Sequence, residues 1–469
     1  MSNQDYPLAL PTTRVVSAPS QAGLILGCKI TITDGVTDHI FYDSLTDTMT
    51  KCKTIVIGGG AAGLMAAGRA AQRGCDVLLL EKMEQTGRKI GISGKGRCNV
   101  TNSAELTEFM AHFGKNGRFL RQCFQQYFSQ DVLSFFQKHN LPLTLERGGR
   151  YFPESGRALD VVKVFNSWLE QEGVELRKRS HVSRIVIEDG CVAGVVCNNS
   201  IITADNVILA TGGQSYPRTG SSGDGYKLAA KLGHTITPLR PALVPLTSSD
   251  PSLKALKGLD LRNIEVRLFI DGKKKDQDFG ELSFTAHGFT GPTILTLSEQ
   301  VVHALELGKQ ASLELDLKPA LDINKLDARL VRDLDKRRGE PIDSILRGLL
   351  PKEFIPVCLD ACNIPENIDT NNFPGKMRKK LVHWFKSLRF DITGYRSWNE
   401  AIVTSGGVSL KEINPKTMES KLIGGLFIVG ELLDLHADTG GFNFQAAFST
   451  GWLAGSSVRG FFFHPNLGI

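Results

Sequence analysis

The sequence lacks the features that mark several large classes of protein. It has no stretch of about 18 uncharged apolar residues, so we expect no transmembrane helix. The nine cysteines are scattered and odd in number, without a Cys-x-x-Cys pair, so neither a disulfide framework nor a thiol-pair redox motif is expected. An excess of one charge is also missing, because 49 acidic residues accompany 55 basic ones. The resulting net charge of +6 suits an anionic ligand and by itself makes no case for nucleic acid.

Glycine is the residue type present in excess. The chain has 48 glycines among 469 residues, against an average usage of about 7%. This excess indicates tight turns and places where the backbone comes close to a ligand. The hydrophobic fraction of 41% is ordinary for a globular protein, and the length predicts two or three domains.

The first clear pattern in the chain is a β-strand, a glycine turn, a helix and a second strand. A buried strand is expected over 54–57, a helix over 61–72 and a second strand over 77–80, closed by Glu81. This order within about 30 residues is typical of a parallel sheet. Residues 1–50 show no such pattern, and we expect a poorly ordered extension there, with an N-terminal strand pair as the alternative.

The remaining chain divides into an outer and an inner part. A cluster of prolines, Pro238, Pro241 and Pro245, marks a crossing between domains. We therefore predict an α/β, Rossmann-type domain from 51–240 and 396–469, interrupted by an inserted domain over 241–395. In the first part we expect a basic loop over 85–102, a hairpin over 182–198, and helices over 105–113, 117–127, 130–139 and 161–171. In the inserted and final parts we expect strands over 259–270, 311–317 and 425–430, and helices over 322–337, 343–348, 352–361, 376–387 and 443–456.

The glycine turn fits the dinucleotide fingerprint G-x-G-x-x-G. Gly58 permits the tight turn, Gly60 allows the backbone to approach a pyrophosphate, and Gly63 lets the helix pack close to the sheet. The N-terminus of the helix offers free N–H groups and partial positive charge to phosphates. Glu81 follows about twenty residues later, where an acid accepts hydrogen bonds from ribose hydroxyls and disfavours a 2′-phosphate.

Two further motifs favour FAD over NAD. The sequence Ala210-Thr211-Gly212-Gly213 follows a buried strand and would bring the backbone close to a flavin. Gly430-Glu431 follows another strand, and a helix beginning near Asn443 would point its positive end at the flavin. Purely structural roles for these turns are the alternative.

Together these motifs resemble the YhiN/BaiN-type FAD-dependent oxidoreductases, described as aminoacetone-oxidase-like or 3-dehydro-bile-acid delta(4,6)-reductase-like flavoproteins. The resemblance spans about 53–455. It rests on the strings GRKIGISGKGRCNVTN from Gly87, ATGGQSYPRTGSSGDGY from Ala210, PLRPALVPL from Pro238, VTSGGVSL from Val403 and GELLDLHADTGGFNFQA from Gly430. It implies a glutathione-reductase-like FAD domain with an inserted β-rich domain that carries a small helical subdomain. The family usually has a histidine directly after Phe-Thr, whereas this chain has Ala286 there and His287 one position later.

The expected cofactor contacts come from all of these segments. Arg88, Lys89, Lys95 and Arg97 could neutralise the FAD pyrophosphate or an anionic substrate, or could belong to a solvated loop. We interpret Cys98 as a packing residue, with a redox thiol as the alternative. No metal site is expected. The full set of expected cofactor residues is Gly58, Gly60, Ala61, Ala62, Gly63, Glu81, Lys82, Arg88, Lys89, Ser93, Gly94, Arg97, Cys98, Asn99, Ala210, Thr211, Gly212, Gly213, Gly430, Glu431, Asp438, Gly440, Gly441 and Asn443.

Candidates for proton transfer are few. His436, His287 and Tyr216 could each assist, although a loop histidine that bonds the backbone is an equally simple interpretation. Hydride transfer needs no protein nucleophile, because the flavin carries it out.

The sequence leaves the electron source and the substrate open. We find no second dinucleotide fingerprint, so NADH or NADPH would dock transiently, or oxygen would reoxidise the flavin. The leading hypothesis is a cytoplasmic FAD-dependent reductase that acts on a small or hydrophobic organic molecule, with no nucleic-acid or membrane partner. The alternatives are an oxygen-using amine or aminoketone oxidase, and a non-catalytic FAD-binding sensor or RNA-associated protein.

Overall fold

The computed structural model describes residues 52–458. The expected N-terminal extension over residues 1–50 lies outside this range. The chain forms two large hydrophobic cores, and we call them the first core and the second core. The first core is built from residues before 240 and after 407, and the second from residues 246–392.

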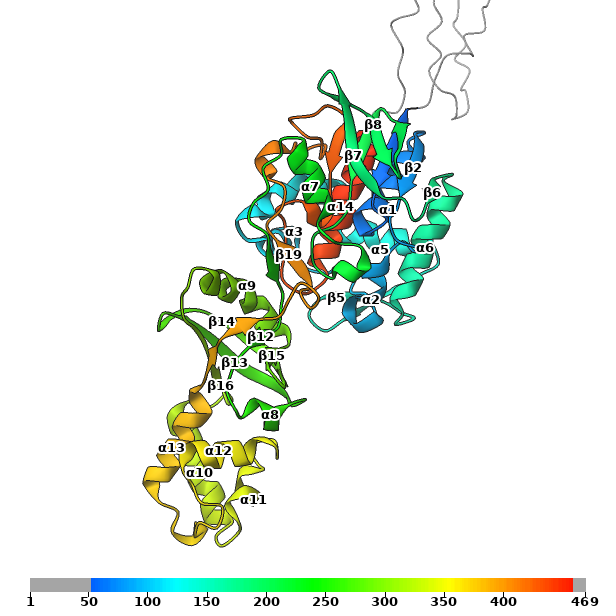
Figure 1. The fold of residues 1–469 in the computed structure, drawn as a ribbon. Coiled ribbons are helices and arrows are strands. Elements are labelled where there is room, and N and C mark those ends of the chain that lie inside the picture. The colour runs from blue at the N-terminus through cyan, green and yellow to red at the C-terminus, as the bar shows by residue number, and fades with distance from the viewer. Residues whose placement is uncertain (1–51, 459–469) are drawn as a thin grey trace, which may run out of the picture. The chain divides into compact units, whose positions relative to one another are not determined.

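The first core is organised around a five-stranded parallel sheet (Figure 1). Its order is β20 (Leu426–Ile428), β10 (Asn206–Leu209), β1 (Lys53–Ile57), β2 (Asp76–Leu80) and β6 (Glu175–Arg177). The central strand β1 is buried along four of its five residues, as its run of β-branched side chains predicts. The strand–turn–helix–strand pattern expected from the sequence is therefore confirmed.

Helices and two small sheets complete the first core. The helices are α1 (Ala61–Gln72), α2 (Arg88–Gly96), α3 (Leu106–Ala111), α4 (Arg121–Gln126), α5 (Ser129–Lys138), α6 (Ala158–Gln171), α7 (Asp224–Lys231) and α14 (Phe442–Ser457). The small antiparallel sheets are β3 (Thr101–Asn102), β5 (Arg150–Pro153) and β4 (Leu143–Glu146), and β7 (Val182–Glu188), β8 (Cys191–Cys197) and β9 (Ser200–Thr203). The pair β7–β8 is the hairpin expected over 182–198.

Small residues bring α1 and α14 into close contact. A Cβ added at Gly451 would lie 2.3 Å from the carbonyl oxygen of Ala62, and one at Gly455 would lie 2.5 Å from that of Ala66. Because no side chain larger than glycine fits at these positions, α14 is fixed against the helix that follows the glycine turn. This contact joins the two ends of the described chain into one core.

The second core fills a seven-stranded antiparallel sheet and its helices. The strand order is β17 (Leu388–Ile392), β16 (Ala311–Asp316), β13 (Asp260–Ile270), β14 (Lys273–Thr285), β15 (Gly288–Thr290), β12 (Leu246–Thr247) and β18 (Gly394–Tyr395). The helices are α8 (Leu253–Leu256), α9 (Pro292–Glu306), α10 (Ile323–Lys336), α11 (Ile342–Leu346), α12 (Phe354–Cys362) and α13 (Gly375–Lys386). The last four gather into one helical group (Figure 1).

A two-stranded ribbon lies between the cores. It pairs β11 (Arg240–Ala242) with β19 (Val403–Ser405) in antiparallel register. The predicted domain boundaries, at 240/241 and 395/396, fall in or near this ribbon. Ala242 and Val403 of the ribbon and Leu243, directly after β11, form a small hydrophobic cluster against which Leu295 of α9 packs.

Two sequence-based expectations need correction. The expected loop over 85–102 contains α2, which is anchored by the buried side chain of Ile90 and loses helical geometry at Ser93, Gly94 and Lys95. Its three glycines conceal the helical pattern in the sequence. The helix expected over 117–127 is split into a 3₁₀ turn, Gly114–Leu120, followed by α4. The elements β14 and α9 were not predicted from the sequence.

No helix of residues 52–458 has the length and the hydropathy that a membrane crossing requires.

Candidate functional site

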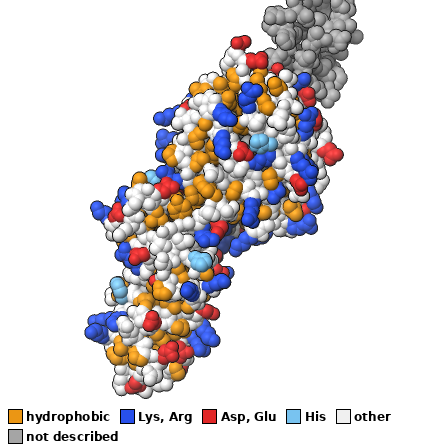
Figure 2. Space-filling view, in the orientation of Figure 1, with side chains coloured by type: hydrophobic (Ala, Val, Ile, Leu, Met, Phe, Trp, Pro, Cys, Tyr) orange, Lys and Arg blue, Asp and Glu red, His pale blue; other side chains and the backbone are white. Residues whose placement is uncertain are grey.

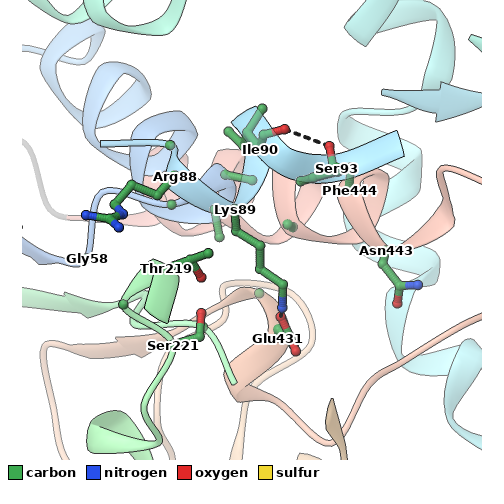
Figure 3. Close-up of a pocket in the computed structure, with 18 of the residues that line it drawn as sticks. Gly58, Arg88, Lys89, Ile90, Ser93, Thr219, Ser221, Glu431, Asn443 and Phe444 are labelled. Atoms are coloured by element: carbon green, nitrogen blue, oxygen red, sulfur yellow. Dashed lines mark hydrogen bonds and ion pairs between the residues drawn. The ribbon is translucent and has the colours of Figure 1, made fainter. Parts of the chain in front are cut away.

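A cavity of about 540 Å³ opens where the turn after β1, the end of β2, α2, the end of β10 and the start of α14 meet (Figure 3). Most of the residues expected to contact a cofactor line it. These are Gly58, Gly60, Ala61, Ala62, Glu81, Lys82, Arg88, Lys89, Ser93, Gly94, Asn99, Ala210, Thr211, Gly212, Gly430, Glu431, Asp438, Gly440, Gly441 and Asn443. Segments almost 400 residues apart therefore contribute to one cavity. They meet because parallel neighbouring strands end at the same edge of the sheet.

Four of the expected cofactor residues do not line this cavity. A Cβ at Gly63 would lie 1.9 Å from the Gly58 carbonyl oxygen, and one at Gly213 would lie 2.3 Å from Thr404 Oγ1, so both glycines serve close packing. Arg97 forms an ion pair with Glu146 and lies over the ring of Phe152.

Cys98 is the fourth residue outside the lining. Its side chain is fully buried, and its backbone has a φ of 60°. Burial raises the pKa of the Cys98 thiol to about 12. The protonated thiol is a poor nucleophile, so the packing interpretation of this residue fits the structure better than the redox one.

Two of the fingerprint glycines, Gly58 and Gly60, differ in why glycine occupies the position. Gly58 has a φ of +104°, and a Cβ there would meet the backbone at Ala210, so the fold itself requires glycine. A Cβ at Gly60, in contrast, would meet no atom of the described part of the chain within 4 Å. Gly60 also has an ordinary φ of −86°. Since nothing among residues 52–458 requires glycine at this position, the space beside Gly60 fits a ligand that approaches the backbone.

Glu81 ends β2 at the cavity wall and organises the turn. Its Oε2 accepts a hydrogen bond from Gly59 N at 2.7 Å, and its Oε1 accepts one from Met83 N at 2.7 Å. The carboxylate is therefore fixed in place at the position where the sequence predicts a ribose contact. Each oxygen retains capacity for a further donor.

Lys89 and Glu431 form the central ion pair of the cavity. Lys89 extends from α2 to Glu431, with Nζ 2.6 Å from Oε2 (Figure 3). Ser215 Oγ and Thr404 N donate to Oε1 of the same carboxylate at 2.7 and 2.9 Å. Burial opposes the charged carboxylate, but Lys89 and these donors outweigh it and lower the pKa of Glu431. Lys89 is therefore paired with an acid of the protein, and its expected contact with a pyrophosphate or an anionic substrate stays a prediction.

The N-terminus of α14 faces the cavity at the other end. Gly440 and Gly441 precede the helix with φ values of 135° and 95°, and both line the cavity. Asn443 does not cap the helix through its side chain, because its amide binds the backbone N–H and carbonyl of Ala437. Asn99 also lines the cavity, and its buried Oδ1 has no partner among the described residues.

The three proton-transfer candidates have different surroundings. Tyr216 lines the cavity, and burial together with Glu400 raises the pKa of its hydroxyl. His436 does not line it, because its ring is engaged by Glu299 at 2.9 Å. His287 is exposed in the turn between β14 and β15. Tyr216 is therefore the candidate that remains next to the cavity.

Sequence reasoning missed several residues that line the cavity. They include Leu243 and Ile402 beside the ribbon, Arg150 on β5, His181 before β7, and Thr219 and Ser221 before α7. Leu243, Thr219 and Ser221 lie within the strings that carry the family resemblance, but the sequence did not indicate that they line a cavity. Only the fold brings these residues together. No group of three or more histidine, cysteine or acidic residues within 52–458 could hold a metal ion.

These residues fit FAD. The open space at Gly60 offers a place for a pyrophosphate. The unpartnered Asn99 Oδ1 can accept a hydrogen bond from a donor of the ligand. The N-terminus of α14 offers a place for a group with negative charge. FAD has all three kinds of group. The glycine turn and the cavity that it borders are typical of a Rossmann-type flavoprotein site.

Comparison with known proteins agrees. The family described as "HI0933-like protein Rossmann domain" matches residues 52–457, and the chain belongs to this family. A 3-dehydro-bile acid delta(4,6)-reductase of Clostridium scindens is 32% identical over 86% of this chain and 98% of its own length. A ribosomal RNA dihydrouridine synthase of Haemophilus influenzae is 32% identical over 87% of this chain and 98% of its own length.

The fold also resembles a solved structure. An open-conformation flavocytochrome c3 fumarate reductase aligns with a TM-score of 0.50 at 19% identity, covering 87% of this chain and 78% of that one. The predicted α/β, Rossmann-type class and the predicted cofactor are therefore confirmed. The chain is an FAD-dependent oxidoreductase, and the non-catalytic sensor that the sequence left open is not supported.

Proposed function

We propose that this enzyme is a reductase that adds hydrogen across a carbon–carbon double bond conjugated with a carbonyl group. The names of the two relatives support this proposal. A delta(4,6)-reductase and a dihydrouridine synthase each saturate such a bond, although their substrates differ in size and charge. FAD, when bound, supplies the hydride for this class of reaction.

The chain's own residues are suited to a flat, apolar acceptor. Leu243, Ile402 and Val403 form an apolar part of the cavity wall beside the ribbon, and Phe152 and Phe444 add aromatic surface. Apolar walls with few polar groups are typical of sites for small organic ligands. Tyr216 is the candidate to hold a proton near such a ligand, since its hydroxyl stays protonated at neutral pH.

A uracil base in ribosomal RNA is the second candidate substrate. One relative is named for that reaction, and Arg88, Lys95 and Arg150 line the cavity without a carboxylate partner among the described residues. Such side chains could contact phosphates. On the face shown in Figure 2, however, basic and acidic side chains intermingle, which favours a small molecule over a long RNA contact.

The source of the electrons and the location of the enzyme in the cell stay predictions. The absence of a second fingerprint in the sequence favours transient docking of NADH or NADPH, with oxygen as the alternative acceptor that would make the enzyme an oxidase. A cytoplasmic location is proposed from the cysteine pattern.

One experiment separates these possibilities. The FAD-loaded protein is reduced anaerobically with NADH or with NADPH, and the flavin absorbance is followed. The reduced protein is then mixed with a conjugated steroid dienone, with a ribosomal RNA transcript, or with oxygen. Rapid reoxidation by the dienone with formation of the saturated product supports the leading proposal. Reoxidation by RNA alone supports the second candidate, and reoxidation by oxygen alone contradicts both.

A further inference from the structure

One face of α9 packs against the ribbon that separates the two cores. Leu295 packs with the cluster of ribbon residues, and Val302 packs with Val244 one helical turn away from Ser298. Between them Ser298 Oγ accepts a hydrogen bond from Val244 N at 3.1 Å. These positions recur at helical spacing, so this face of α9 is fixed against the ribbon.

Glu299 lies on the same face and makes two polar contacts. Its Oε1 accepts a hydrogen bond from Ser405 Oγ of β19 at 2.8 Å. Its Oε2 lies 2.9 Å from Nε2 of His436. One carboxylate therefore joins a helix of the second core, the ribbon, and a loop of the first core. We call the contact between Glu299 and His436 the junction pair.

His436 belongs to the loop that borders the cavity. Its neighbours Leu435, Asp438, Thr439, Gly440 and Gly441 line the cavity, and the loop leads directly into α14. The loop is also tied to the first core, because Asn116 Nδ2 donates to the Asp434 carbonyl at 2.8 Å.

The electrostatic surroundings favour a charged junction pair. Burial disfavours the imidazolium, but Glu299, Asp434 and Asp438 outweigh it and raise the pKa of His436. Burial likewise opposes the carboxylate, but His436, Ser405 and Arg240 lower the pKa of Glu299. The charged groups around the pair are Arg240 on β11, Glu306 on α9, Asp434 and Asp438 on the loop, His112 beside Asp438, and Asp278 on β14. Burial and the nearby Asp438 raise the pKa of Asp278.

We propose that Glu299 and His436 are positioning residues, which hold the cavity-lining loop 434–441 in place from across the junction between the two cores. His436 was a candidate proton donor from the sequence. Its engagement by Glu299 assigns it instead to fixing the loop, and so to setting the shape of the cavity where α14 begins. This role does not depend on which substrate the enzyme reduces.

The proposal predicts a pH dependence with a definite sign. The pair is complete when His436 is protonated and Glu299 is ionised. Because the folded-state pKa of His436 is raised, its contribution is present below the usual histidine pKa of about 6.5 and is lost as the pH rises through the raised value. The loop should therefore loosen on the alkaline side.

Amide hydrogen exchange on the full FAD-loaded chain tests this. The wild type is compared with E299Q, H436Q and the double variant, in segments 292–306 and 434–441, after correction for the intrinsic pH dependence of exchange. Each single variant should lower protection in both segments about fivefold, a modest effect because the pair is partly exposed. The double variant should lose no more than either single one, and the pH dependence of the wild type should disappear in all three.

A matched control lies within the first core. His234 and Glu412 form a similar pair, with Nδ1 3.1 Å from Oε2, that does not cross the junction. E412Q should leave both segments unchanged. Flavin content is measured in parallel, so a loss of cofactor is recognised separately. Wild-type protection in both E299Q and H436Q, or an equal loss in E412Q, would overturn the proposal, whereas failure to reduce any tested substrate would bear only on the proposed function.

Discussion

The cavity of the first core and the interior of the second core are built in different ways. In the first core the cavity depends on missing side chains, with glycines at the β1 turn, before α14 and between the packed helices. In the second core Phe284, Phe289, Phe354 and Phe390 pack edge to face or tilted within one cluster. Cofactor binding and the stability of the second core should therefore respond to different substitutions.

The largest expected effect is on stability in the second core. Phe354 is fully buried between Phe284 and Trp384, with ring centroids 5.5 Å away in each case. Phe354→Ala should cost about 4 kcal/mol of unfolding free energy, because it removes the ring and leaves a cavity. Denaturant unfolding measures the loss, and FAD titration should show an affinity within about twofold of the wild type. The control Ile323→Ala, at a side chain that is 60% exposed, should change neither. A parallel loss of FAD affinity in Phe354→Ala would break the comparison.

The next largest effect is expected on FAD binding, from a substitution at Gly60 in the first core. Gly60→Val should weaken FAD binding by about 100-fold or more, because the new side chain would occupy the open space beside the turn. Its unfolding transition without FAD should stay close to that of the wild-type apoprotein. Gly375→Val is the matched control, since a Cβ at Gly375 also meets open space but lies at the start of α13. If Gly60→Val bound FAD normally, the cofactor would lie elsewhere.

The partly buried ion pair of the cavity should have an intermediate effect. Glu431→Gln leaves Lys89 without its carboxylate and should cost about 2 kcal/mol of stability at neutral pH. The wild type has a lowered Glu431 pKa, so this contribution is present above the usual carboxyl pKa of about 4.3 and is lost as the pH falls through the lowered value. Unfolding curves at several pH values should converge for the two proteins under acid conditions. A constant difference at every pH would contradict this account of the pair.

The smallest effect is expected at Arg97. Its ion pair with Glu146 is exposed, with 44% of the Arg97 side chain accessible. Arg97→Ala should therefore change stability by less than about 1 kcal/mol and leave FAD affinity unchanged. Lys89→Ala, which removes a charge from the same helix region but inside the cavity, should reduce FAD affinity measurably. If Arg97→Ala reduced FAD affinity as much as Lys89→Ala does, Arg97 would contact the pyrophosphate as the sequence suggested.

The sequence predicted many local elements of both cores, including β13, β16 and the helices α10 to α13 of the second core, but it did not predict contacts between distant segments. Gly58, Gly60 and Glu81 lie in a local motif whose spacing fixes strand, turn and helix, so their positions follow from sequence alone. The wall residues Leu243 and Ile402 depend on a ribbon whose two strands are about 160 residues apart in the chain, and no local pattern marks such a pairing. Similarly, Arg97 and Lys89 look equivalent in the sequence, and only the fold assigns them to Glu146 and Glu431. The contact between His436 and Glu299 depends on α9, which was not predicted from the sequence.

The most direct test of the central claim is the flavin content of the purified chain of 469 residues. The absorbance spectrum of the native protein, followed by release and quantification of the flavin, should give one FAD per chain and the bands of an oxidised flavoprotein. A protein that is colourless, and that takes up no FAD on reconstitution while keeping a cooperative unfolding transition, would contradict the account.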